Sequence, residues 1–380
     1  MKIGVLTFHS QLNYGGVLQC WALKRALERM GYDVCVIDRW IDRNNRLLKG
    51  PFAGGVIEWI RFIGKVFLFR VDVRYLLRIR RTINFVRALG LSEYHFYDWG
   101  DAPKELGLDL IVVGSDQVWN PSFTFTKAYL MADVKGVPRM SYAASFGCAR
   151  LPDDLQDYYK RALAKFTAVS CRESEGVKIC SELGVVAKHA VDPTLLLNRE
   201  DWMEFAGKGR VKYKKLVCYF MDERCLDALP SIRWFARKMH CHVEIFQNSP
   251  IKHKKFLFDS RIRFCYGSGP VEFVRSFAEA EWVITDSFHA VMFASIFSCN
   301  LRFVRPLDFS RGAMFARVGE FGEVFIKGKW LSDDVAKALI SFEDDAPVVF
   351  DHDKIQEWCN NSRGWLMNAI DGVQHAQPNV

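Results

Sequence analysis

Residues 3–37 decide the fold, and they read IGVLTFHSQLNYGGVLQCWALKRALERMGYDVCVI. The apolar run 3–8 predicts a buried strand, and a polar loop with two glycines follows it. Residues 17–30 carry apolar side chains at helical spacing and end at Gly31, and residues 33–37 predict a second strand. A strand, loop, helix and strand in this order are typical of a doubly wound parallel sheet, so we predict an α/β fold.

The same alternation continues and then restarts after Trp202. Strands are expected at 108–113, 139–144, 168–171, 216–221, 242–246, 282–285 and 301–304, with helices between them and a last helix at 353–370. A chain of 380 residues is also longer than one hydrophobic core usually serves. We predict two Rossmann-like domains with a central cleft, spanning 1–200 and 210–350, followed by a C-terminal helix and tail at 351–380. The last helix suits packing on either domain.

The composition of the chain indicates its cellular compartment and whether it needs a cofactor. The 11 cysteines are spread singly without C-x-x-C spacing, which favours a reducing compartment and gives no metal-ligand cluster. The first apolar run is too short for a signal peptide, and no stretch of 18 apolar residues occurs. We therefore predict a cytoplasmic protein without a metal or other cofactor. The net charge of +8 suits an anionic substrate or surface, but it also fits ordinary scatter.

Two polar loops follow predicted strands of the first domain. Asn13, Tyr14, Gly15 and Gly16 precede the first helix, whose free N–H groups attract anions, although the same residues suit a plain turn. Ser115, Asp116 and Trp119 suit sugar hydroxyls and a sugar face, but Asp116 also suits a helix cap and Trp119 a core position.

Cationic and acid/base candidates also lie after predicted strands. Arg172 suits a carboxylate or phosphate ligand, or a surface ion pair with Glu173 or Glu175. His289 is our first choice among nine histidines for proton exchange, with Asp286 and Ser287 beside it, although a hydrogen-bonded structural histidine fits the same pattern. Arg311 and Arg317 suit phosphate binding or a solvated loop.

The stretch 56–89 is strongly basic. Between residues 57 and 89 it holds eight Lys or Arg and two acidic residues among many apolar ones. A basic amphipathic helix suits the surface of an anionic membrane, or packing on its own domain. Nucleic acid is not expected, because no known binding motif accompanies the charge.

Taken together and in order, these segments resemble the polysaccharide pyruvyl transferase family. The matching residues are IGVLTF at 3–8, NYGGVLQ at 13–19, LIVVGSDQVWNP at 110–121, SYAASFG at 141–147, CRE at 171–173, VDPTL at 191–195 and VITDSFH at 283–289. The resemblance spans residue 1 to about residue 317. One departure is Ala290, where relatives commonly have glycine.

The resemblance implies a glycosyltransferase-B-like pair of domains, with the acceptor on the N-terminal side and the donor on the C-terminal side. It implies phosphoenolpyruvate as co-substrate, a sugar acceptor that is free or lipid-linked, a catalytic His289, and Arg172 as a donor contact. The chemistry would be ketal formation on the sugar. The alternatives are a nucleotide-sugar-dependent glycosyltransferase of the same fold and a non-catalytic sugar-binding protein.

Overall fold

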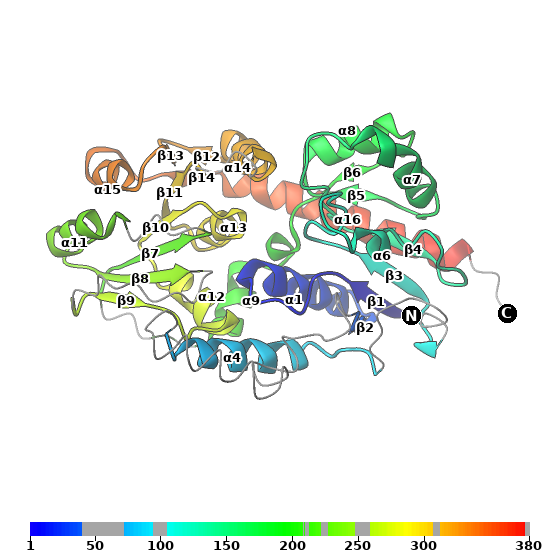
Figure 1. Ribbon diagram of the computed structural model, residues 1–380, viewed down its shortest axis with the longest axis horizontal. Coiled ribbons are helices and arrows are strands. Elements are labelled where there is room, and N and C mark those ends of the chain that lie inside the picture. Colours follow the sequence, from blue (N-terminus) through cyan, green and yellow to red (C-terminus); the bar gives the residue numbers. More distant parts are fainter. Residues whose placement is uncertain are drawn as a thin grey trace.

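Two parallel β-sheets form the frame of the molecule, and each is covered by helices (Figure 1). The computed structural model describes residues 1–39, 72–93, 105–207, 209, 213–221, 227–247, 259–306 and 312–376. The first sheet comes from the N-terminal part of the chain and the second from the part after residue 214, so the predicted α/β class is confirmed. The exact domain limits 1–200, 210–350 and 351–380 stay a prediction.

The first sheet has the strand order β2-β1-β3-β4. Its strands are β1 (Lys2–Leu6), β2 (Asp33–Val36), β3 (Leu110–Val113) and β4 (Arg139–Ser141). Two short strands, β5 (Ser170–Cys171) and β6 (Lys188–His189), continue it through a bridge between Ala144 and Cys171. The described helices of this half are α1 (Tyr14–Arg29), α4 (Tyr75–Arg87), α6 (Thr126–Leu130), α7 (Asp153–Leu163) and α8 (Ser174–Glu182).

The second sheet has the order β13-β11-β10-β7-β8-β9. Its strands are β7 (Lys215–Phe220), β8 (His242–Gln247), β9 (Ile262–Phe264), β10 (Trp282–Thr285), β11 (Asn300–Val304) and β13 (Leu331–Ser332). Its helices are α11 (Leu229–Lys238), α12 (Pro270–Ala278), α13 (Phe288–Phe297), α14 (Gly312–Phe325) and α15 (Val335–Asp344). A small antiparallel pair, β12 (Ile326–Lys327) and β14 (Val349–Phe350), lies beside them.

The strand orders locate the ligand-binding edge of each sheet. In the first sheet the chain adds β2 on one side of β1 and then adds β3 and β4 on the other side, so the direction reverses between β1 and β3. In the second sheet the same reversal lies between β7 and β10. Ligands of open α/β sheets bind beyond the carboxyl ends of the strands at such switch points. The loops that begin after β1, β3 and β10 therefore hold the expected site.

Several helices differ from the sequence prediction. The helix expected between the strands at 282–285 and 301–304 begins only three residues after the first of them, at Phe288, because Ser287 has the extended backbone of an N-cap. Helix α9 (Arg199–Ala206) lies where the two predicted domains, 1–200 and 210–350, were expected to join, and its start is fixed by a capping box between Asn198 and Asp201. Helices α14 and α15 were not predicted at all.

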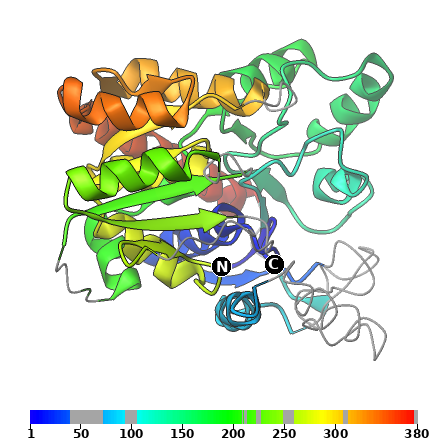
Figure 2. The same cartoon turned by 60° about the vertical axis from the view of Figure 1, so that its left-hand side comes forward.

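The C-terminal helix α16 (His352–Ala376) leaves the second half and packs on the first (Figures 1 and 2). Its Ser362 hydroxyl accepts a hydrogen bond of 3.1 Å from the backbone N–H of Val191, and Arg363 donates one of 2.9 Å to the carbonyl of Leu196. The sequence left both placements open, and these contacts show that the helix crosses back. None of the described helices combines the length and apolar content that a bilayer crossing needs.

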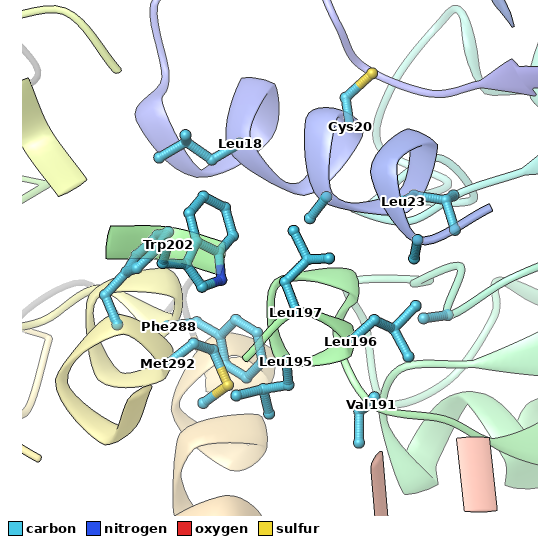
Figure 3. Close-up of a cluster of buried hydrophobic side chains, with 14 of the residues drawn as sticks. Leu18, Cys20, Leu23, Val191, Leu195, Leu196, Leu197, Trp202, Phe288 and Met292 are labelled. Atoms are coloured by element: carbon cyan, nitrogen blue, oxygen red, sulfur yellow. The ribbon is translucent and has the colours of Figure 1, made fainter. Parts of the chain in front are cut away.

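A shared apolar core joins the two halves (Figure 3). The short helix η1 (Pro193–Leu196) lies between α1 and α13, with Leu18 on one side and Phe288 and Met292 on the other. Tyr14, the first residue of α1, also enters the second half: it stacks on Phe273 at 4.4 Å and donates a hydrogen bond of 2.8 Å to the carbonyl of Ser268. The halves are therefore held in a defined arrangement around the site.

Candidate active site

His289 lies in the first turn of α13, directly after strand β10. The turn before it is tied to the end of β7, because the Thr285 hydroxyl donates to the carbonyl of Tyr219 at 2.6 Å and Asp286 accepts from the N–H of Met221 at 2.8 Å. Asp286 and Ser287 thus shape the turn that presents His289. The histidine itself is 9% exposed.

Arg172 lies in the loop between β5 and α8 and is 4% exposed. Its Nη1 donates a hydrogen bond of 2.9 Å to Oδ2 of Asp192, and its Nη2 lies 3.6 Å from Oδ1 of Asp116. Burial alone would lower the pKa of Arg172, but the carboxylates of Asp192 and Asp116 outweigh it and raise that pKa. The surface ion pair that the sequence also allowed is therefore not the arrangement found.

Asp192 connects the histidine and the arginine. Its Oδ2, which accepts from Arg172, lies 3.6 Å from Nε2 of His289 and 3.5 Å from the hydroxyl oxygen of Ser115. Burial acts to raise the pKa of Asp192, but His289, Arg172 and the N–H of Thr194 together hold it far below its usual range. Asp192 is therefore a carboxylate at neutral pH.

Arg317 on α14 lies close to the same centre from the second half and is 5% exposed. Its Nη1 donates a hydrogen bond of 2.9 Å to the hydroxyl of Ser145 and lies 3.9 Å from Oε2 of Glu173. Burial and the nearby guanidinium of Arg172 lower the pKa of Arg317 to about 10. Both guanidiniums lie over the Phe288 ring, at 5.0 Å for Arg172 and 5.6 Å for Arg317.

The N-terminus of α1 closes the site from the first half. Asn13 caps this helix by accepting a hydrogen bond of 3.0 Å from the N–H of Gly15. A Cβ atom on Gly15 would lie 2.2 Å from Nδ1 of His289, whereas a Cβ on Gly16 would meet Asp116 Oδ2 only at 3.4 Å. Gly15 is therefore needed for the close approach of the helix to the histidine.

The other predicted site residues lie elsewhere. Tyr14 packs in the second half as described above, and Trp119 is fully buried in the core of the first half, where its ring lies 5.3 Å from that of Phe146. Arg311 lies outside the described residues. The structure thus brings Ser115, Asp116, Arg172, His289 and Arg317 together with the start of α1.

A pocket of about 230 Å³ opens beside the two arginines. Its walls are largely apolar, with Phe288, Phe321 and Trp358 among them, and His189 and Glu320 add polar groups. Nε of Arg172 and Nε of Arg317 are buried without a hydrogen-bond partner among the described residues. The Nε atoms of Arg39 and Arg139 are also buried and unpaired among the described residues, so the signal for an anionic ligand is that two buried guanidiniums line the same pocket.

Three residues of this site were not singled out from the sequence. Asp192 lies in the VDPTL segment, where an Asp-Pro pair indicates only a turn. Glu173 was considered as the surface partner of Arg172, but its Oε1 accepts a hydrogen bond of 3.0 Å from the N–H of Phe146 instead. Ser145 lay within the quoted segment 141–147 and carried no signal of its own. The common feature, a position just after a strand, could have drawn attention to each.

Two Rossmann-like halves meet where His289, Arg172 and Arg317 lie close to the start of α1, and this is the architecture of a glycosyltransferase-B-like protein. The family model for polysaccharide pyruvyl transferase matches residues 13–305, which is most of the chain. The chain belongs to the polysaccharide pyruvyl transferase family, and it is a transferase.

Solved structures support the fold. A UDP-GlcNAc 2-epimerase from Methanocaldococcus jannaschii is 12% identical with a TM-score of 0.52, covering 90% of this chain and 92% of that chain. The S. aureus MnaA-UDP structure is 10% identical with a TM-score of 0.52, covering 100% and 98%. Identities this low show the fold alone, and the predicted glycosyltransferase-B-like fold is confirmed. A comparison with curated protein sequences gives no match.

Proposed function

We propose that this enzyme transfers pyruvate from phosphoenolpyruvate to two hydroxyls of a sugar in a polysaccharide or its precursor, forming a pyruvate ketal. The observation that carries the proposal is the pair of buried arginines, Arg172 and Arg317, which line one pocket together with Asp192, the neighbour of His289. Phosphoenolpyruvate carries a phosphate and a carboxylate, and guanidinium groups bind both kinds of anion. Membership of the family supports the same donor.

The residue types suit the steps of the reaction. His289 gives a proton to the methylene carbon C3 of phosphoenolpyruvate, and a sugar hydroxyl attacks C2. The C2–O bond to phosphate then breaks, and a second hydroxyl of the same sugar closes the ketal. Of the two hydroxyl protons, one returns to His289 and the other leaves with phosphate, so the atoms and charges balance. Arg172 and Arg317 stabilise the departing phosphate.

The test is a binding titration by calorimetry, with phosphoenolpyruvate set against a panel of nucleotide sugars. We expect the wild type to bind phosphoenolpyruvate and Arg172→Ala to lose that binding, whereas His289→Ala keeps most of it. Arg302→Met is a matched control, because Arg302 is buried in the second half and hydrogen-bonds Ser341 and Asn300, away from the cleft. It should bind phosphoenolpyruvate as the wild type does.

Other outcomes point to the alternatives. A nucleotide sugar that binds while phosphoenolpyruvate does not would favour a glycosyltransferase of this fold. Binding of a sugar without turnover of any donor would favour a non-catalytic sugar-binding protein. Either result would overturn the proposed pyruvyl transfer.

We also propose that α4 contacts an anionic membrane, which would bring the enzyme to a lipid-linked acceptor. Arg80 and Arg87 are exposed seven residues apart on this helix, and the half-exposed Leu77 lies one turn before Arg80, so the outer face is basic and partly apolar. Arg78 does not belong to that face, because it is 1% exposed and donates hydrogen bonds to the carbonyls of Gln247 and Leu12. The rest of the predicted stretch, 56–71, lies outside the described residues.

Co-sedimentation with phosphatidylglycerol vesicles tests the membrane contact. We expect binding that weakens with salt and falls in an Arg80→Gln, Arg87→Gln double variant. A Lys160→Gln, Arg161→Gln variant of α7 removes the same charge from another exposed helix and should bind as the wild type. Equal binding by all three proteins would contradict the contact.

A further inference from the structure

Hydrogen bonds hold the side chain of Asp192 in place, although this residue lies in the connection between a strand and a short helix. It follows β6 and caps η1, where its Oδ1 accepts two hydrogen bonds from Thr194, one of 3.0 Å from the N–H and one of 2.7 Å from the hydroxyl. The carboxyl group is 2% exposed. The two oxygens of the carboxylate therefore have different partners, because Oδ1 accepts both hydrogen bonds from η1 and Oδ2 faces the site.

The other oxygen, Oδ2, faces groups from three other elements. They are Arg172 before α8, His289 on α13 and Ser115 after β3, at 2.9, 3.6 and 3.5 Å. A carboxylate oxygen only accepts hydrogen bonds. The imidazole nitrogen turned toward it, Nε2, therefore has a favourable interaction only when it carries a proton.

We propose that Asp192 is a positioning residue that fixes the tautomer of His289, with the proton on Nε2 and Nδ1 left as the nitrogen that exchanges a proton with the substrate. The inference rests on the proposed function for what Nδ1 does, but not for which nitrogen is protonated. Nδ1 lies on the side of Gly15, at the N-terminus of α1, where a Cβ would be only 2.2 Å away. The same Cβ would lie 2.5 Å from Cγ and 2.8 Å from Cε1 of His289, so Gly15 packs against the face of the ring at Nδ1.

The variant Asp192→Asn makes a sharp prediction because Thr194 fixes the direction of the new amide. The two donors of Thr194 require an acceptor, so the amide oxygen takes the place of Oδ1. The NH2 group then takes the place of Oδ2 and points at His289. An N–H donor in that place needs an acceptor, so Nε2 loses its proton and Nδ1 gains one.

Nitrogen-15 NMR of the protein labelled only at histidine reads the tautomer directly, and the His289→Gln variant identifies the resonances of His289. In the neutral wild-type ring we expect Nε2 to be the protonated, pyrrole-like nitrogen. In Asp192→Asn we expect the two resonance positions to be exchanged. Asp201→Asn is the control, because Asp201 is a buried carboxylate paired with Arg29 at the C-terminal end of α1, and it should leave His289 unchanged.

Two outcomes would overturn the inference: a wild-type ring protonated on Nδ1, or an unchanged tautomer in a folded Asp192→Asn protein. The wild-type measurement needs no variant, so the inference stays testable even if Asp192→Asn does not fold. The proposed function is tested independently, since a protein that does not bind phosphoenolpyruvate can still show the predicted tautomer. A purely structural role for Asp192 would lower stability without exchanging the two nitrogens.

Discussion

Arg172 and Arg317 are both buried at the same pocket, but their surroundings differ in charge. Arg172 faces the carboxylates of Asp192 and Asp116, whereas Arg317 has Glu173 only at 3.9 Å and the cation of Arg172 nearby. The first arginine is therefore part of what holds the site together. Burial of the second arginine, Arg317, lowers the stability of the folded protein, as expected for a cation whose role is to bind an anionic ligand.

This difference predicts opposite effects of the same substitution. Arg172→Met leaves two buried carboxylates without their cation and should lower the free energy of unfolding by about 3–5 kcal/mol. Arg317→Met removes a cation whose pKa burial has lowered to about 10, so stability should be unchanged or higher, on the order of 3 kcal/mol at most. Both should lose phosphoenolpyruvate binding. Urea denaturation measures the stabilities, and a strongly destabilised Arg317→Met would contradict the account.

Asp192 gives the stability a defined dependence on pH. Its pKa is lower in the folded protein than the unfolded value of about 3.9, so its contribution is present above about pH 4 and is lost as the pH falls. The quantity to follow is the difference in the free energy of unfolding between the wild type and Asp192→Asn. Below about pH 4 it should shrink by about 1.4 kcal/mol per pH unit. A difference that stays constant down to pH 3 would mean that the carboxyl is not depressed.

The two glycines at the start of α1 form a matched pair for substitution. Gly16→Ala should raise stability by about 0.4–1 kcal/mol, since it restricts the unfolded chain and its Cβ meets only an ordinary contact. Gly15→Ala places a Cβ against the imidazole of His289, so it should displace that ring and reduce turnover of phosphoenolpyruvate. Thermal melts and phosphate release measure the two effects. If the two variants had the same stability and the same turnover, Gly15 would have no special role.

At the scale of elements, helix α4 links the two halves through hydrogen bonds of one side chain. Arg78 lies 4.4 Å from the ring centre of Tyr14 and donates to carbonyls of both halves, at Leu12 and at Gln247. Arg78→Met keeps the apolar stem and leaves these buried carbonyls without that donor. We expect a loss of about 2–4 kcal/mol in the free energy of unfolding, measured in urea, with Arg80→Met within about 0.5 kcal/mol of wild type.

Elements also show what the sequence can and cannot predict. His289 and Arg172 were found because parallel strands place their carboxyl ends on one edge, so loops after strands must meet. Tyr14 and Trp119 lie in the right loops, but local pattern does not say which core a side chain enters. Helix α9 was missed because a glycine-rich polar stretch follows it directly. Asp192 depends on contacts with three separate segments, which no local pattern contains.

At the scale of the whole molecule, the two halves share one core rather than meeting at a small polar interface. Helix η1, α9 and the buried residues of Figure 3 belong to both. We therefore expect a single cooperative thermal transition, with equal calorimetric and van't Hoff enthalpies and coincident melting by circular dichroism and tryptophan fluorescence. Two separated transitions would show that the halves unfold independently.

The return of α16 to the first half has a consequence for synthesis on the ribosome. Residues 352–376 complete the packing around η1 through Ser362 and Arg363, yet they are translated after the whole second half. Domains usually fold in the order in which they emerge. Here the packing around Val191 and Leu196 is completed only after residues 352–376 have emerged, so these apolar residues stay accessible to chaperones while the second half is translated.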